Sequence, residues 1–182
     1  MHYAQIRKMD ISNGEGCGVS LFTQGCPIRC EGCHNSSIWN FDGGKEFSFE
    51  TLQTIINLID ARPYIKRFSI LGGEPLLPQN YRDLYNLCTE IKFARPDIKI
   101  WLWSGYTFKE IWQHAQEDTS NYLFALLGIV DVLVDGPFIA EQRDITLKWR
   151  GSKNQRVIDL KSTLSGSYLF GTKIPEPILY CD

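Results

Sequence analysis

The sequence predicts a single α/β domain in which an open, mostly parallel sheet curls toward a partial (β/α) barrel. Apolar strand-like segments alternate with amphipathic helical segments, which is typical of right-handed βαβ crossovers. The 182 residues suffice for one well-buried core but not for eight complete βα units, so we expect the curl to stay open on one side. The domain is expected to span residues 1–182 and to end in an irregular tail over residues 160–182.

The first half of the chain contains two predicted strands and two predicted helices. The strands are expected over residues 19–23 and 68–71. Ser48 can cap a helix that runs to about Ala61 and carries apolar side chains at i, i+3, i+4 and i+7: Leu52, Ile55, Ile56 and Ile59. A second amphipathic helix follows the second strand and turns four side chains inward: Leu84, Leu87, Cys88 and Ile91. At this spacing Cys88 is interpreted as a small core residue rather than a ligand.

The second half continues the alternation. Residues 98–103 are predicted to form a third strand, and Thr107 with Glu110 matches a capping box that would start a third helix. A fourth strand is expected over residues 130–134 and a fifth over residues 156–160. The functional loops of such folds lie at the carboxyl ends of the strands, all on one side of the sheet.

Unusual residues follow each of the first four predicted strands. They are a cysteine run over residues 26–33, a Gly-Gly-Glu-Pro turn over residues 72–75, a Ser-Gly-Tyr turn over residues 104–106 and an Asp-Gly-Pro turn over residues 135–137. Because these strand ends meet at one edge of the sheet, we expect the four segments to form one composite site.

The turns after the second, third and fourth strands suit ligand binding. Gly72 and Gly73 would let the backbone approach a ligand closely, and Glu74 offers an acceptor for a cationic group such as an ammonium. Ser104 could hydrogen-bond a carboxylate or hydroxyl, although both turns also fit ordinary connections between a strand and a helix. Asp135 ends a buried strand, so its carboxylate is expected to meet a backbone amide or a bound group.

The cysteine run, Cys26, Cys30 and Cys33 with spacing C-x3-C-x2-C, is the most informative motif. Three thiolates can bind three irons of a four-iron cluster and leave the fourth iron open to a small molecule. A zinc site is the poorer alternative because no second ligand pair follows, and His34, directly beside Cys33, is badly placed for the same ion. A redox dithiol would leave Cys26 unexplained, and Cys17 as a fourth ligand would make a closed electron-transfer centre.

Composition excludes several classes of protein. The formal net charge of −2 gives no sign of nucleic-acid binding, and no secretion signal or membrane span is visible, so we expect a cytoplasmic protein with no membrane partner. The six cysteines are then more easily explained as thiols or metal ligands than as disulfides. The local exception in charge, residues 148–156, carries four cations and is either a solvated loop or a docking surface.

Together these residues resemble the radical S-adenosylmethionine (SAM) superfamily, whose signature is C-x3-C-x2-C followed by a Gly-Gly-Glu element. Within it, the chain is similar to the small activating enzymes of anaerobic ribonucleotide reductase. The resemblance extends from about Ile11 to Asp159 and includes residues 13–16, 24–26, 33–35 with Trp39, 132–138 and 150–156. Many superfamily members carry an aromatic residue before the third cysteine, where this chain has Gly32, as these small activases generally do.

The resemblance implies the open partial barrel of the radical SAM type and an oxidoreductase activity. Cys26, Cys30 and Cys33 would hold a [4Fe-4S] cluster whose open iron chelates SAM. The implied cofactor-binding residues are Gly32, Cys33, His34, Gly72, Gly73, Glu74, Ser104 and Asp135. Reductive cleavage of SAM would give a 5′-deoxyadenosyl radical that takes hydrogen from a glycine Cα of anaerobic ribonucleoside-triphosphate reductase, with a flavodoxin-like electron donor and only without oxygen.

Two other functions stay open at this point. The chain could activate another glycyl-radical enzyme, such as one of the pyruvate formate-lyase type, although its short length argues against this, or act on a small molecule. It could also be a non-catalytic iron–sulfur or zinc-binding module for electron transfer.

Overall fold

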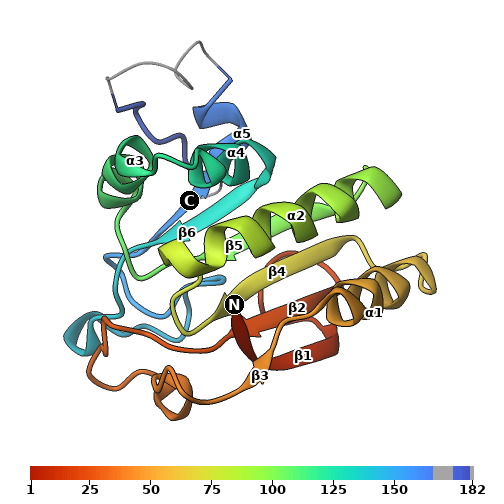
Figure 1. The fold of residues 1–182 in the computed structure, drawn as a ribbon. Helices are drawn as coiled ribbons and strands as arrows, with labels where there is room; N and C mark the ends of the chain where they lie inside the picture. The colour runs from red at the N-terminus through yellow and green to blue at the C-terminus, as the bar shows by residue number, and fades with distance from the viewer. Residues whose placement is uncertain (166–173, 181–182) are drawn as a thin grey trace.

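The computed structural model describes residues 1–165 and 174–180, and a single seven-stranded sheet organises them (Figure 1). The strands are β1 (His2–Asp10), β2 (Gly18–Thr23), β3 (Lys45–Glu46), β4 (Arg67–Gly72), β5 (Lys99–Trp103), β6 (Val132–Asp135) and β7 (Arg156–Asp159). The helices are α1 (Phe49–Asp60), α2 (Pro78–Ala94), α3 (Phe108–Glu117), α4 (Tyr122–Ile129) and α5 (Leu160–Thr163), with short 3-10 helices at Ser36–Ile38 and Ala140–Gln142. The predicted α/β class is therefore confirmed.

The sheet is parallel in its centre and antiparallel at both edges. Its strand order is β3-β1-β2-β4-β5-β6-β7, and β2, β4, β5 and β6 pair in parallel. The four predicted parallel strands are confirmed, whereas the fifth, β7, forms but runs antiparallel to β6. The sequence did not predict β1 and β3, because β1 mixes charged and apolar residues and β3 is only two residues long.

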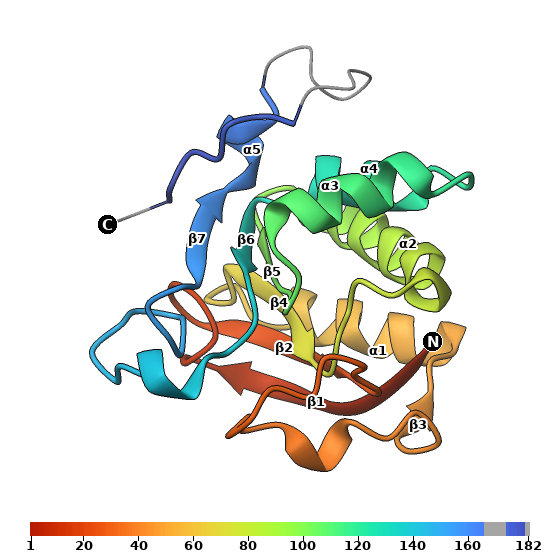
Figure 2. The same cartoon turned by 90° about the vertical axis from the view of Figure 1, so that its left-hand side faces the viewer.

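Helices cover only one face of the sheet. Figure 2 shows α1 to α4 on one side, while the chain between β6 and β7 lies on the other side. Alternate side chains of the central strands, among them Leu21, Ile70 and Leu102, are fully buried in the main core with side chains of these helices. The opposite face carries a smaller buried cluster around Trp101, and loops rather than helices cover this face.

The helix starts follow the predicted capping chemistry. The Ser48 side chain accepts a hydrogen bond from the Thr51 backbone at the start of α1, and the capping box of Thr107 and Glu110 is present at the start of α3. Helix α4 was not predicted, because it is apolar on nearly all sides and shows no amphipathic pattern.

The tail beyond Asp159 begins with α5 and returns to the sheet. The Asp159 backbone N–H donates to the Ile178 carbonyl at 2.8 Å, and the Tyr180 N–H donates to the Val157 carbonyl at 2.8 Å. This short stretch therefore covers the outer edge of β7. Cys181, noted in the sequence as a stray thiol, lies outside the described residues. Over residues 1–165 and 174–180, no helix combines the length and apolar character needed to cross a lipid bilayer.

Candidate functional site

The cysteine loop (residues 24–35) folds back on itself directly after β2. The Gly25 backbone, with φ of 89°, donates to the Ile38 carbonyl at 2.9 Å, and the Cys26 N–H donates to the Trp39 carbonyl at 3.1 Å. Within the loop, the Cys33 N–H donates to the Cys30 carbonyl at 3.2 Å. These bonds hold the loop at the carboxyl ends of the parallel strands, where the sequence predicts a composite site.

One pocket brings the strand-end segments together. Its lining includes the predicted residues Cys26, Cys30, Cys33, Gly72, Gly73, Glu74 and Ser104. Sequence reasoning missed further lining residues: Ile28, Asn35, Trp103, Phe138 and Gln155. Trp103 and Phe138 could have been found, because each stands within three residues of a predicted strand-end motif. The lining does not include Gly32, His34 and Asp135.

The three thiols lie together in this pocket and influence one another. Burial raises the pKa of Cys26 and of Cys30, and part of the rise comes from a neighbouring thiol, Cys30 for Cys26 and Cys33 for Cys30. Among the described residues, no three His, Cys, Asp or Glu side chains are grouped as they would be around one metal ion. Three thiols that line one pocket are a donor set that fits a multi-iron cluster, in which several irons each need a ligand.

Cys17 is not placed to complete this site. It directly precedes β2, whereas the cysteine loop follows β2, and six extended residues separate the two ends by about 20 Å. The structure therefore argues against a closed centre with Cys17 as fourth ligand. Cys88 is fully buried in α2, as predicted for a core residue, and burial raises the pKa of its thiol strongly.

The two glycines at the end of β4, Gly72 and Gly73, are required by the backbone conformation and by close backbone packing. Gly72 has φ of 115°, a conformation that favours glycine. A Cβ on Gly73 would lie 2.2 Å from the Gly25 carbonyl oxygen, and the next residue, Glu74, donates its N–H to the same oxygen at 2.8 Å. The Gly-Gly-Glu turn and the cysteine loop are thus locked together through their backbones.

Glu74 is the most strongly perturbed acid of the pocket. It is 1% exposed, and burial raises the pKa of its carboxyl group to about 7. Its carboxylate accepts hydrogen bonds from the Ser104 hydroxyl, the Gly105 N–H and the Leu76 N–H, each at 2.8 Å. In this structure Glu74 and Ser104 therefore bind each other and join the turns after β4 and β5, rather than presenting free groups to a ligand.

Asp135 meets a backbone amide, one of the two partners predicted for it. Its carboxylate accepts from the Phe108 N–H at 2.6 Å, at the start of α3, and from Arg156 Nε at 3.1 Å. His34, in turn, is exposed on the cysteine loop and lies beside Phe138, with 6.4 Å between ring centroids.

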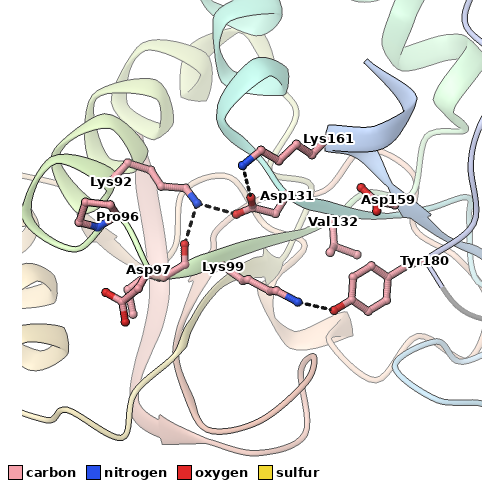
Figure 3. Close-up of a pocket in the computed structure, with 10 residues that line it drawn as sticks. Lys92, Pro96, Asp97, Lys99, Asp131, Val132, Asp159, Lys161 and Tyr180 are labelled. Carbon is pink, nitrogen blue, oxygen red and sulfur yellow. Dashed lines mark hydrogen bonds and ion pairs between the residues drawn. The ribbon is translucent and has the colours of Figure 1, made fainter. Parts of the chain in front are cut away.

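A second pocket lies at the opposite end of the sheet, near the start of β5 and β6 (Figure 3). Its charged side chains bind one another. Asp131 accepts hydrogen bonds from Lys92 Nζ at 2.7 Å and from the Ile100 N–H at 2.7 Å, and the Lys99 amine donates to the Tyr180 hydroxyl at 2.8 Å. The pocket is thus a junction of structural contacts, and the pocket beside the cysteine loop remains the candidate functional site.

Comparison with known proteins defines the class of protein first. Residues 12–158 match the family model described as a 4Fe-4S single cluster domain, and this match includes all the segments that build the pocket. The fold and the cysteine loop are thus those of a single-cluster iron–sulfur domain.

Individual relatives then identify the family within this class of iron–sulfur domains. The chain is 41% identical over 156 residues to the anaerobic ribonucleoside-triphosphate reductase-activating protein of Vibrio cholerae, covering 85% of this chain and 96% of the relative. Proteins of the same name from Enterobacteria phage T4 (38% over 159 residues, 86% and 93%) and Escherichia coli strain K12 (38% over 162 residues, 88% and 100%) are similarly close. This chain belongs to the family of anaerobic ribonucleoside-triphosphate reductase-activating proteins.

Proposed function

We propose that this chain activates an anaerobic ribonucleoside-triphosphate reductase as a radical SAM enzyme of the cytoplasm. The observation that carries the proposal is the shared pocket of Cys26, Cys30 and Cys33 with the Gly-Gly-Glu turn, at the carboxyl edge of the parallel strands. The names of the relatives support the target, and the family model supports the [4Fe-4S] cluster. The one-sided cover of the sheet is compatible with the open partial barrel of the radical SAM type.

The residues of the pocket would have the following roles. Cys26, Cys30 and Cys33 would hold the cluster, which supplies the electron that breaks a carbon–sulfur bond of SAM and so yields a 5′-deoxyadenosyl radical. Gly73 and Glu74, held against the cysteine loop, would orient the amino end of SAM. To bind the amino group, Glu74 would have to use a carboxylate that already accepts three hydrogen bonds from the protein.

Other residues would shape the space around the adenosyl group. Trp103 and Phe138 line the pocket with apolar surface that would limit access of water to the radical. Gly32 and His34 lie beside Phe138, and Asp135 accepts hydrogen bonds from Phe108 and Arg156 next to the loop that carries Phe138.

The target atom would be a glycine Cα in a loop of the reductase. The electron would come from a flavodoxin-like donor, and activity would require the absence of oxygen because an iron without a protein ligand is open to oxidation.

Reconstitution under anaerobic conditions tests the proposal. The reduced, reconstituted protein should release 5′-deoxyadenosine from SAM and, when mixed with the reductase, produce a glycyl-radical signal in electron paramagnetic resonance. Cys26→Ala should abolish both, while the matched control Cys17→Ala should keep the cluster and both activities.

Four outcomes would contradict the proposal. Zinc as the only bound metal would exclude the cluster. A cluster that survives Cys26→Ala would place it elsewhere. A correctly assembled cluster that releases no 5′-deoxyadenosine would indicate an electron-transfer module, and a signal only with another glycyl-radical enzyme would change the partner.

A further inference from the structure

A group of aromatic side chains connects the tail to the wall of the cysteine pocket. Trp103 lines this pocket, and its ring stacks on Trp101 with 5.7 Å between ring centroids and 23° between ring planes. Trp149, from the segment before β7, and Tyr180, from the tail, each meet Trp101 edge-on, at 5.0 Å and 5.1 Å. Rings from three separate parts of the chain therefore pack together on the sheet face opposite the helices.

A hydrogen bond fixes the orientation of Trp103 within this group. Its indole Nε1 donates to the Trp149 carbonyl at 2.8 Å. Ring stacking tolerates sliding and rotation of one ring over another, whereas a hydrogen bond prefers one direction. The position of the Trp149 carbonyl therefore decides how the Trp103 indole lies in the pocket wall.

The backbone of Trp149 has a conformation that a bulky residue rarely takes. Its φ of 61° lies in the left-handed region, which costs a non-glycine residue free energy and persists only where neighbouring contacts hold it. The Trp149 ring makes such contacts, because it packs against Trp101 and lies beside Tyr180 with 6.2 Å between ring centroids. The carbonyl that holds Trp103 thus depends on the packing of the Trp149 ring.

Tyr180 is itself anchored to several parts of the fold. Its backbone N–H donates to the Val157 carbonyl at 2.8 Å. Its hydroxyl accepts from the Lys99 amine at 2.8 Å and donates to the Glu15 carboxylate at 2.7 Å. These partners belong to β7, to β5 and to the loop between β1 and β2. The Tyr180 ring is therefore held against Trp101 and Trp149 rather than resting on them loosely.

We propose that Trp149 and Tyr180 are positioning residues for Trp103: the tail packs Tyr180 against Trp149, whose carbonyl holds the Trp103 indole in the orientation that receives the ligand. A wall that is ordered before binding avoids the cost of ordering it during binding. Loss of the Tyr180 ring should release Trp149 and let Trp103 take more than one orientation. The ligand is the SAM of the proposed function, on which this part of the inference rests.

Fluorine NMR of the full chain labelled with 5-fluorotryptophan tests the position of Trp103 directly. Trp103→Phe and Trp112→Phe identify the two resonances that are compared. Tyr180→Ala should shift or split the Trp103 resonance, because the rings and the hydrogen bond around this indole change. The resonance of Trp112, which is fully buried in the main core, should stay unchanged. Trp112 thus separates a local release of Trp103 from a general loosening of the fold.

The tail offers a matched control and conservative variants. Leu179, directly before Tyr180, is 47% exposed, so Leu179→Ala should leave the Trp103 resonance unchanged. Tyr180→Phe keeps the ring and loses only the hydroxyl bonds, and should stay close to the wild type. Tyr180→Leu keeps an apolar side chain without a ring, and it decides the matter if Tyr180→Ala does not fold.

Binding of SAM to the anaerobically reconstituted protein measures the consequence for the pocket. At an iron content equal to that of the wild type, Tyr180→Ala should raise the Kd for SAM by a factor of about two to ten, the cost of ordering one released side chain during binding. Leu179→Ala should keep the wild-type Kd.

An unchanged Trp103 resonance in both Tyr180→Ala and Tyr180→Leu would overturn the inference, as would equal shifts of the Trp103 and Trp112 resonances. A Tyr180→Phe variant with the full effect of Tyr180→Ala would assign the role to the hydroxyl and contradict the packing argument. A shifted Trp103 resonance with an unchanged Kd would refute the effect on the ligand. Failure of the proposed function differs from all of these, because the wild type itself would then hold no cluster or bind no SAM.

Discussion

At the residue scale, Glu74 is predicted to bind a ligand, but in the structure its carboxylate also connects two parts of the fold. The sequence placed it in a turn and suggested an acceptor for a cation. In the structure its carboxylate is buried and accepts bonds from Ser104, Gly105 and Leu76, so it ties two strand-end turns into one wall of the pocket. No local pattern could reveal this, because Ser104 is 30 residues away along the chain.

The raised pKa of Glu74 predicts a pH dependence of stability. In the unfolded chain the carboxyl group has its ordinary pKa of 4.5, and in the folded protein about 7, so the folded state binds more protons between these values. The stabilisation from protonated Glu74 is complete below about pH 4.5 and is lost as the pH rises toward 7. The loss amounts to about 3 kcal/mol in the free energy of unfolding.

Urea denaturation of the metal-free protein at several pH values measures this effect. Glu74→Gln should flatten the dependence between pH 4.5 and 7. The exposed Glu31→Gln is the control and should retain the wild-type slope. A Glu74→Gln variant with an unchanged slope would show that Glu74 is ionised in the fold over the whole range.

At the scale of elements, Asp131 connects five of them. It stands between α4 and β6, and its carboxylate binds Lys92 of α2 and the Ile100 backbone of β5, while its carbonyl accepts from the Leu160 N–H at the start of α5 (Figure 3). The sequence showed Asp131 only as a charge that interrupts an apolar segment. Its role depends on the parallel pairing of β5 and β6, which brings Ile100 beside it.

Asp131→Ala should therefore destabilise the whole domain. It leaves the Ile100 N–H without its acceptor and the Lys92 amine, which still donates to the Ile98 carbonyl at 2.7 Å, without its charged partner. The expected cost is about 2–4 kcal/mol. The comparison variant Asp97→Ala removes a carboxylate that is 45% exposed and pairs with Arg95 and Lys66, and its loss should be much smaller. Chemical denaturation of both variants gives the comparison, and equal losses would refute the role of Asp131.

At the scale of the whole molecule, the cations of residues 148–156 separate into two groups. Arg156 pairs with the buried Asp135, and Lys153 pairs with Asp144 at 3.7 Å, so both have partners within the fold. Lys148 is exposed, and Arg150 has an Nε that is buried without a hydrogen-bond partner in the part of the chain that the structure describes. A docking role for this segment, as the sequence suggested, therefore falls to Lys148 and Arg150 rather than to Arg156.

We expect the double variant Lys148→Ala with Arg150→Ala to weaken binding to the reductase by roughly tenfold, since contacts of surface charges contribute on the order of 1 kcal/mol. Binding measured by titration calorimetry at low and high salt should show the larger effect at low salt. Lys8→Ala, an exposed cation of β1, serves as control. Unchanged affinity in the double variant would exclude the segment as a docking surface.

The sequence by itself determined the α/β class, the four parallel strands, the helix caps at Ser48 and Thr107 and the cysteine loop at a strand end. These depend on periodicity, capping chemistry and motif spacing, which are local and visible in a single chain. The antiparallel direction of β7 and the edge strands β1 and β3 depend on pairing with distant strands.

Only the tertiary structure decided how the site is supported. It showed that Cys17 lies beyond the far end of β2, that Glu74 binds Ser104, and that Asn154 and Gln155 donate hydrogen bonds to the Pro137 and Gly136 carbonyls after β6. Each of these facts joins residues whose separation in space is set by the pairing of strands and the packing of loops. Local sequence patterns carry no information about such distances.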